Sequence, residues 1–414
     1  MKKKFKISLY PIAVILAYFF CIIRLSYVPN INNYALIIDI LLFIFLFLKG
    51  AVTKNYKYRK INFSLFVFCI LAIVSSIVNM KNIDGTLLYV LKIVDITLLV
   101  QYVTEIKKDV NSSKILFFLS VIMTFVTIGY QMSHPFFAWK NGLNYFIGSK
   151  FSVSYNAISS MIFYQYAFGN GKHKNIFNII LIILFGFVVY ACDYVKCMTG
   201  VIGAIICFIF IILAKLKKLK KLKSKKTSVL LKSNTAILIF IISAISVLIL
   251  EKIISIPIIE DFIINTLGKS SDLSGRLIVY ENYPIYLKDH IIFGYGYNNV
   301  YELFKDTMRI RSNSFAFDAQ NALLEYFLYF GLFGTSSFIV FVKNSFKRLG
   351  NLSIDEMDRK RIFILGFYLL VFLGIIEITI NPLFYLFLSF IACGEKEGEI
   401  DNEKSGNNQY AEDN

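Results

Sequence analysis

The chain has 414 residues, of which 57 % are hydrophobic and only 17 % are charged, and its mean hydropathy is +0.63. Soluble domains carry about 25 % charged residues and lack repeated apolar runs of about 20 residues, the length that crosses a hydrocarbon core. The composition therefore excludes a water-soluble chain and predicts an all-α polytopic membrane protein. A net charge of +17 would suggest a nucleic-acid partner for a soluble protein. In a membrane protein the same excess sets the topology, so no nucleic-acid partner is expected.

Apolar runs along the chain predict about twelve transmembrane helices. They are centred on residues 7–28, 34–48, 62–79, 83–103, 115–132, 151–168, 176–192, 198–214, 234–256, 319–342, 362–378 and 380–393. Twelve crossings would place both termini on the same side of the membrane.

Lysine and arginine are distributed unevenly between the alternate loops of this layout. The loops on the side of the termini hold 31 of them and the opposite loops hold 11. Because strongly basic loops stay in the cytoplasm, both termini are predicted to be cytoplasmic. The tract at 215–223, within the basic loop 215–232, is predicted to be part of a plain cytoplasmic loop, with an interfacial helix on anionic headgroups as the alternative. The acidic tail at 395–414 has too little apolar surface to fold and is predicted to be disordered.

One loop is much longer than the others. It separates residues 1–256, which hold the first nine predicted helices, from residues 318–394, which hold the last three. Residues 257–317 are expected outside the cell and should form a folded cap, since loops of about 60 residues are rarely structureless. Their tyrosines, asparagines and the GlyTyrGly tripeptide at 294–296 suit sugar binding. The alternative is an amphipathic cap that rests on the bilayer with its tyrosines at headgroup level.

Cysteine and histidine are so sparse that no structural metal site is expected. The six cysteines form no CxxC pair and no cluster with histidine at zinc-ligand spacing. They are expected to be small buried apolar side chains, although Cys192 and Cys197 flank a short loop and could form a disulfide. The outer loops contain no AspXAsp motif, so we expect no divalent metal in the reaction and no other cofactor.

Three arginines are predicted to lie outside the cell, all in or beside the long loop. They are Arg276, Arg309 and Arg311. A guanidinium group binds phosphate oxygens bidentately and keeps its proton, so these arginines suit a diphosphate leaving group. A single exterior arginine is more often a contact to a lipid headgroup or to the protein surface, whereas three in one loop favour a shared anionic ligand.

Polar residues also interrupt the apolar helices. Asn321 and Glu325 are four residues apart, so they share a helix face, which should look into the bundle or into a water-filled cavity; interhelical hydrogen bonding is the alternative. Lys92 and Asp95 are three residues apart and are expected to neutralise each other. Glu377 has no evident partner in the sequence.

Two further outer segments offer cations and amides. Lys150 and Asn156 are expected near the surface before the sixth span, and Lys196 occupies a tight outer turn that is followed by Thr199 and Gly200. Together with the long loop, these segments predict a site for an anionic, lipid-linked, sugar-bearing substrate.

The segments SerGlyArg (274–276), GlyTyrGlyTyrAsn (294–298) and GlnAsnAlaLeuLeuGluTyrPheLeuTyrPheGlyLeuPheGly (320–334) resemble the signature region of the O-antigen polymerase and O-antigen ligase superfamily. The likeness is strongest over residues 270–335. It implies a fold similar to the C-type glycosyltransferases. It also implies transfer of a glycan from undecaprenyl diphosphate to an acceptor hydroxyl at the outer face of the bacterial inner membrane. The acceptor is the next lipid-linked repeat unit in the polymerases and a lipid A core in the ligases.

The resemblance assigns roles to individual residues. Arg276 matches the loop arginine of the family, and Gln320 stands where the ligases have a histidine. Because glutamine cannot take a proton, the polymerase branch is favoured, and a base would have to come from Asp318, Glu325 or Glu281, unless the reaction needs little base help. The catalytic residues expected from these arguments are Arg276, Gln320, Asn321 and Glu325, and the substrate-binding and diphosphate-binding residues are Lys150, Asn156, Lys196, Arg309, Arg311, Tyr295 and Gly296.

The expected function is thus a metal-independent polymerase of O-antigen, capsule or exopolysaccharide repeat units, with a flippase and a chain-length regulator as partners. The alternatives are a ligase-like transferase, a flippase or exporter of lipid-linked oligosaccharide, and a membrane scaffold. Transporters of this size tend to consist of two similar halves, which this sequence does not show.

Overall fold

The computed structural model describes most of the chain, and nearly all of that part is helical. The described residues are 9–23, 25, 31–52, 56–140, 143–169, 174–215, 229–261, 264–265, 276–304, 309–311, 314–315, 318–350, 352 and 354–394. The tail at 395–414 and the basic tract beyond Lys215 lie outside them, as do Ser274 and Gly275.

The helices that lie within the predicted spans follow one another in the predicted order. They are α1 (Tyr10–Ala17) with the π-helical turn η1 (Tyr18–Ile22), α2 (Ile31–Val52), α3 (Arg59–Val78), α4 (Ile83–Glu105), α5 (Asp109–Ser133), α7 (Lys150–Phe168), α8 (Lys174–Tyr194), α9 (Met198–Lys215), α11 (Ser233–Ile245), α12 (Val247–Ile254), α16 (Ala322–Leu349), α17 (Ile354–Leu373) and α18 (Pro382–Ala392).

The remaining elements lie in the connections between these helices. They are η2 (Tyr56–Tyr58), α6 (Phe137–Lys140), α13 (Pro257–Asp261), α14 (Arg276–Leu287) and α15 (Val300–Phe304), with the strands β1 (Asn144–Tyr145), β2 (Gly148–Ser149), β3 (Arg309–Arg311) and β4 (Ser314–Phe315). The strands form two antiparallel hairpins, with Asn144 opposite Ser149 in the first and Arg309 opposite Phe315 in the second.

Each of the twelve predicted spans contains a helix, so the helical part of the prediction is confirmed. In the described part of the chain, four helices are long and apolar enough to cross a membrane by length and composition, namely α3, α5, residues 175–194 of α8, and α16. Four shorter apolar helices accompany them, at residues 10–22, 198–214, 233–245 and 382–392. The chain is therefore consistent with a polytopic membrane protein, and the number of twelve crossings stays a prediction.

Two predicted spans need correction. The span 234–256 is divided between α11 and α12, and the span 362–378 is too long, because α17 ends at Leu373. Glu377 consequently lies in the turn between α17 and α18.

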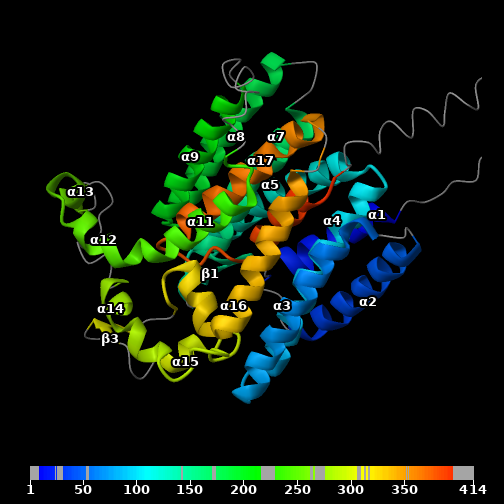
Figure 1. Ribbon diagram of the computed structural model, residues 1–414. Coiled ribbons are helices and arrows are strands. Elements are labelled where there is room, and N and C mark those ends of the chain that lie inside the picture. Colours follow the sequence, from blue (N-terminus) through cyan, green and yellow to red (C-terminus); the bar gives the residue numbers. More distant parts are fainter. Residues whose placement is uncertain are drawn as a thin grey trace, which may run out of the picture.

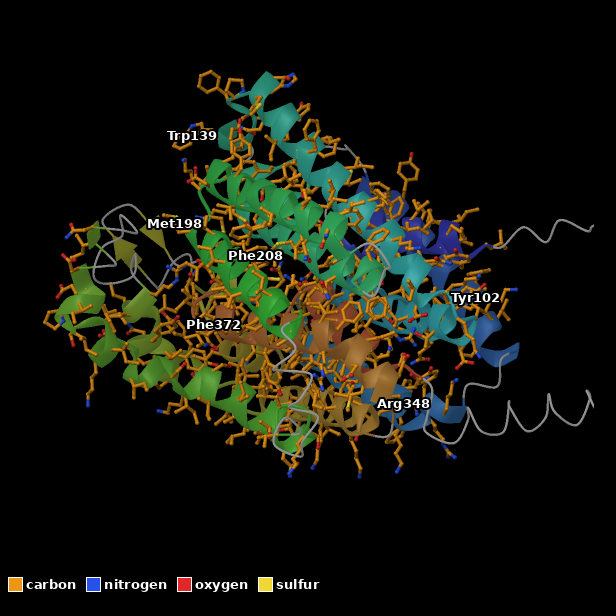
Figure 2. The ribbon with its side chains drawn as sticks, turned by 90° about the horizontal axis from the view of Figure 1, so that it is seen from above. Tyr102, Trp139, Met198, Phe208, Arg348 and Phe372 are labelled. Carbon is orange, nitrogen blue, oxygen red and sulfur yellow. The ribbon has the colours of Figure 1, made fainter. Side chains whose placement is uncertain are left out.

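The bundle is apolar outside and partly polar inside. Phe63, Phe125 and Ile183 expose about two thirds of their surface, at 67, 68 and 65 %, while serine, threonine and asparagine side chains are buried between helices. Figure 2 shows Trp139 at the edge of the molecule, and both Trp139 and Phe372 are exposed. Such a surface is stable only against lipid, which supports a membrane setting.

The central helices are joined by aromatic packing. α16 packs on α3 and α11, and α18 packs on α4 and α17 (Figure 1). Where these helices meet, Phe68, Tyr326, Phe338 and Tyr385 are all less than 2 % exposed. The Tyr326 ring lies 4.9 Å from the Phe338 ring, and its hydroxyl shares a 2.8 Å hydrogen bond with the hydroxyl of Tyr385.

Two asparagines cap the N-termini of α16 and α18. The side chain of Asn321 accepts hydrogen bonds from the backbone N–H groups of Leu323 and Leu324, so it caps α16. Asn381 caps α18 in the same way and is followed by Pro382, whose fixed φ suits the first helical position. Both caps fix the turns that carry the polar residues described below.

A glycine interrupts α16 and admits the long loop. Gly331 has φ +60° and ψ −163°, and a Cβ there would lie 2.3 Å from the carbonyl oxygen of Ile292. On either side, Tyr295 donates its backbone N–H to the Leu328 carbonyl at 2.7 Å, and Leu332 donates to the Ile291 carbonyl at 2.8 Å. The loop therefore joins the broken helix through backbone hydrogen bonds at a point where only glycine fits.

The described part of residues 257–317 has a small apolar cluster of its own. Val279 and Tyr283 of α14 pack with Val300 and Phe304 of α15 and with Leu328 of α16. These elements gather at one end of the bundle, at the lower left of Figure 1. Their position outside the cell stays a prediction.

The six cysteines are free and buried, as the sequence predicts. The expected neutralisation of Asp95 by Lys92 is wrong, because neither carboxylate oxygen of Asp95 has a hydrogen-bond partner among the described residues. Although the two residues are on adjacent turns of α4, the side chain of Lys92 interacts electrostatically with Asp39 of α2 instead.

Candidate functional site

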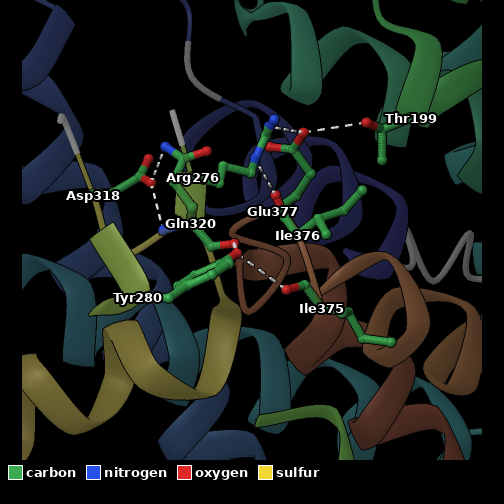
Figure 3. A network of polar contacts seen from close by, with 8 residues as sticks. All are labelled: Thr199, Arg276, Tyr280, Asp318, Gln320, Ile375, Ile376 and Glu377. Carbon is green, nitrogen blue, oxygen red and sulfur yellow. Dashed lines mark hydrogen bonds and ion pairs between the residues drawn. The ribbon is translucent and has the colours of Figure 1, made fainter. Parts of the chain in front are cut away.

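The turn between α17 and α18 is where separate parts of the chain meet. Arg276, the first residue of α14, donates from Nη2 to Oε1 of Glu377 at 2.7 Å and from Nε to the carbonyl oxygen of Ile376 at 3.0 Å (Figure 3). Thr199 of α9 donates to the same Glu377 oxygen at 3.1 Å. The arginine predicted to bind the diphosphate is thus held by a carboxylate, a carbonyl and, through Glu377, the ThrGly segment.

The backbone of the same turn also holds the start of α16. Asn321 donates its amide to the Ile375 carbonyl at 3.1 Å and to the Ser243 carbonyl, also at 3.1 Å. Tyr280 donates its hydroxyl to the Gln320 carbonyl at 2.7 Å (Figure 3). Helix α14, the α17–α18 turn and the start of α16 therefore form one hydrogen-bonded unit. We call it the Arg276 network, and it consists of Thr199, Arg276, Tyr280, Gln320, Asn321 and Ile375–Glu377.

A carboxylate and an amide stand at the edge of this network. The Gln320 side chain donates to Oδ1 of Asp318 at 2.5 Å, and its backbone N–H donates to the same oxygen at 2.9 Å. Both residues are half-buried, and Arg276 attracts the Asp318 carboxylate. Gln320 adopts φ +55°, an uncommon conformation for a residue with a side chain. Its two hydrogen bonds to Asp318 and the one from the Tyr280 hydroxyl hold it there.

Burial shifts the pKa of two side chains in the Arg276 network, Glu377 and Tyr280. Burial raises the pKa of Glu377 to about 7, against the lowering effect of Arg276 and the weaker pull of Lys150. Burial also raises the pKa of Tyr280, so its hydroxyl keeps its proton and remains a hydrogen-bond donor. Lys150, at the start of α7, lies 5.1 Å from the ring of Phe151 and adds a second positive charge to this part of the molecule.

Some predicted site residues have other contacts. Asn156 is 1 % exposed, so its expected place near the surface is wrong: it donates to the Ser120 carbonyl and to Thr124, and it accepts from Tyr18. Lys196, by contrast, exposes 79 % of its side chain and pairs with Asp193 at 3.6 Å.

Other predicted residues hold α16 in place. Glu325 is 1 % exposed and accepts the backbone N–H of Ala319 at 2.6 Å, so the polar stripe faces the interior, as expected. Tyr295 donates its hydroxyl to the Tyr286 carbonyl, and Gly296 donates its N–H to the Tyr329 carbonyl. Arg309 and Arg311 lie on β3, and the orientations of their side chains are outside the described part of the chain.

Sequence reasoning missed Glu377 as a site residue. An ionisable residue at the end of an apolar run was the available signal, because such residues usually have a partner inside the protein. Its partner Arg276 is 101 residues away in the chain, so no local spacing could reveal the pair.

Residues 176–339 match a family model described as O-antigen ligase. The matched stretch includes Thr199, Arg276 and Gln320, and it ends before Glu377. No curated protein and no solved structure matches the chain. The family match does not separate polymerases from ligases, and it confirms the expected resemblance at the level of the superfamily. Over residues 176–339 the chain is therefore similar to the O-antigen ligase family.

Proposed function

We propose that this protein is a polysaccharide polymerase of the bacterial plasma membrane. It transfers the growing glycan from undecaprenyl diphosphate to a hydroxyl of the next lipid-linked repeat unit at the outer face. The observation that carries the proposal is the anchored guanidinium of Arg276, which is held at the meeting point of α9, α14 and the α17–α18 turn.

Arg276 acts on the leaving group. As the bond between the sugar C1 and the diphosphate oxygen breaks, negative charge grows on the diphosphate, and a fixed guanidinium neutralises it without having to reorganise. A preorganised donor of this kind contributes about 3 to 4 kcal/mol to the stability of the transition state. Lys150 adds positive charge beside Glu377, and Arg309 and Arg311 are proposed to bind the diphosphate, with Lys196 at the rim.

Asp318 is the best-placed acceptor for the proton of the attacking hydroxyl. Glu325 is 1 % exposed, so an acceptor hydroxyl has no access to it, and Glu281 is exposed on α14 away from the hydrogen bonds of the Arg276 network. Asp318 is half-buried, and it lies next to Gln320, whose side chain would orient sugar hydroxyls. The hydroxyl proton passes to Asp318, the hydroxyl oxygen bonds to C1, and the diphosphate leaves with the electrons of the broken bond.

The polymerase branch is favoured over the ligase branch by Gln320. The ligases have a histidine at this position, and a glutamine amide cannot accept a proton from an acceptor hydroxyl. A flippase and a chain-length regulator are proposed partners of such an enzyme. The absence of two similar halves disfavours the alternative of a lipid-linked oligosaccharide exporter.

The test is reconstitution of the purified full-length protein with one defined undecaprenyl-diphosphate-linked repeat unit. A ladder of products that differ by one repeat supports a polymerase. Transfer only after a lipid A core is added indicates a ligase. Movement of the unit between leaflets without a new glycosidic bond indicates a flippase and contradicts the proposal.

A further inference from the structure

Three buried side chains meet in the first part of the bundle, in helices that are separate along the chain. They are Cys21 of η1, Asp39 of α2 and Asp95 of α4, which are 2, 0 and 0 % exposed. One ligand atom from each lies within 4.8 Å of the other two. The three helices pack against one another, and none of these residues belongs to the Arg276 network.

Most carboxylate oxygens of this group lack a hydrogen-bond partner among the described residues. Among the described residues, both carboxylate oxygens of Asp95 and Oδ2 of Asp39 have none. Within the group, the Cys21 thiol donates to Oδ1 of Asp39 at 3.5 Å. Buried charged groups are stable only when they are paired or bind a metal ion, so an ionised Asp95 requires an occupant that interacts with it.

The charges of the group point to a divalent cation. Two carboxylates and a thiolate carry three negative charges. Lys92 attracts Asp39 and Cys21 and offsets one of them. A cation of charge +2 would neutralise the remaining two and would give Asp95 the partner that it lacks.

The ligand types indicate which cation. Magnesium and calcium prefer sites made entirely of oxygen, whereas a set with one sulfur and two carboxylates suits zinc and similar transition metals. With Zn–S of about 2.3 Å and Zn–O of about 2.0 Å, tetrahedral geometry places sulfur and oxygen about 3.5 Å apart. The observed distance from Cys21 Sγ to Asp39 Oδ1 is 3.5 Å. This pair is therefore already at the spacing that a zinc ion requires, and a ligand atom of Asp95 lies within 4.8 Å of both.

We propose that Cys21, Asp39 and Asp95 bind one divalent transition-metal ion of the zinc class inside the helix bundle. On binding, the Cys21 thiol releases its proton and the sulfur bonds to the metal, with no change of oxidation state. The π-helical turn η1 presents the cysteine, and such turns are frequent at functional sites. The ion would link η1 to α2 and α4, which makes its role structural.

The experiment uses the full-length protein in lipid nanodiscs, freed of metal by a chelator and titrated with Co²⁺ and then with Zn²⁺. We expect one Co²⁺ per chain and the near-ultraviolet charge-transfer band of a cobalt–thiolate bond, which Zn²⁺ removes. Cys21→Ser should lose this band, and Asp95→Asn should weaken metal binding by at least about tenfold.

Matched controls separate a lost ligand from a lost fold. Cys69→Ser removes another buried thiol, on α3, and Asp109→Asn removes another buried carboxylate, on α5; both should keep the band. Size-exclusion profiles of the metal-free variants check that each is folded. The proposal is overturned if folded wild-type protein shows no cobalt–thiolate band, which would mean that the carboxyl groups hold a proton instead. A band that persists in Cys21→Ser would also overturn it.

Discussion

The ion pair between Arg276 and Glu377 joins two residues with little access to solvent. Their side chains are 17 and 6 % exposed, and the pair is completed by Thr199 and by the Ile376 carbonyl. Removal of one partner from such a pair leaves an uncompensated buried charge, which costs about 3 to 5 kcal/mol. Substitutions here therefore affect stability as well as activity, and the two effects have to be measured separately.

Replacement of Arg276 tests its role at the leaving group. Arg276→Ala should lower polymer formation by about 100- to 1000-fold, because the charge on the diphosphate is no longer neutralised. Arg276→Lys keeps the charge but loses the bidentate fork and should retain intermediate activity. Ladder formation in the reconstituted assay measures both, with the amount of folded protein in the membrane as normalisation.

The matched control is Arg361→Ala on α17, where the arginine pairs with Asp358 at 3.0 Å. That variant should form polymer at the wild-type rate. An unchanged polymer yield from Arg276→Ala would remove the arginine from the mechanism.

Glu377 should make stability depend on pH. Its pKa is raised to about 7 by burial, so the folded protein binds its proton more tightly than the unfolded chain does. The contribution of this group is fully present below about pH 4.5 and falls as pH rises to about 7, by about 3 kcal/mol in total. Glu377→Gln cannot titrate and should lack this component.

Melting temperatures of the wild type and of Glu377→Gln between pH 4.5 and 8 measure the effect. The variant should gain stability relative to the wild type as pH rises through this range. Parallel pH profiles for the two proteins would show that Glu377 does not titrate there.

At the level of elements, α16 depends on its interruption. Gly331 allows residues 291–296 of the loop to bond to the helix backbone on both sides of the break. The GlyTyrGly tripeptide, which the sequence suggested for sugar contact, supplies two of these backbone donors in Tyr295 and Gly296. The break therefore attaches the loop to α16, the helix that Asn321 caps and that begins two residues after Gln320.

Gly331→Ala should destabilise the protein by about 1 to 3 kcal/mol, because a side chain at this backbone conformation is strained. The added Cβ would also lie 2.3 Å from the Ile292 carbonyl oxygen. Gly186→Ala in α8 is the matched control, since no atom lies within 4 Å of a Cβ there, and it should be neutral or stabilising by up to about 1 kcal/mol. Melting temperatures in the same detergent compare the two, and an equal change in both variants would contradict the role of the break.

For the whole molecule, the orientation in the membrane can be measured because the native cysteines are buried. Ile258 on α13 is 82 % exposed, and Val229 before α11 is 50 % exposed. In intact cells, a membrane-impermeant maleimide should label Ile258→Cys and should label Val229→Cys only after permeabilisation. The opposite pattern would place the long loop in the cytoplasm and would contradict the proposed polymerase.

Several site residues show how far sequence patterns reach. The pattern correctly placed Glu325 on an inward face, because helical periodicity is a local property. It placed Asn156 near the surface, whereas the residue bonds to α5 and to η1 inside the bundle. The contacts of a side-chain amide depend on how the helices pack, and the position of one residue in the sequence does not reveal that packing.

The amino-acid sequence by itself determined the helices, the membrane class and the family segment at residues 176–339, since the length of an apolar run and a short motif are both read along the chain. Only the tertiary structure decided that Arg276 meets Glu377, and that Asp95 faces Asp39 and Cys21 and is not neutralised by Lys92. The physical reason is that buried charges select partners by distance through the packed bundle, and packing brings together residues from helices that are far apart in sequence.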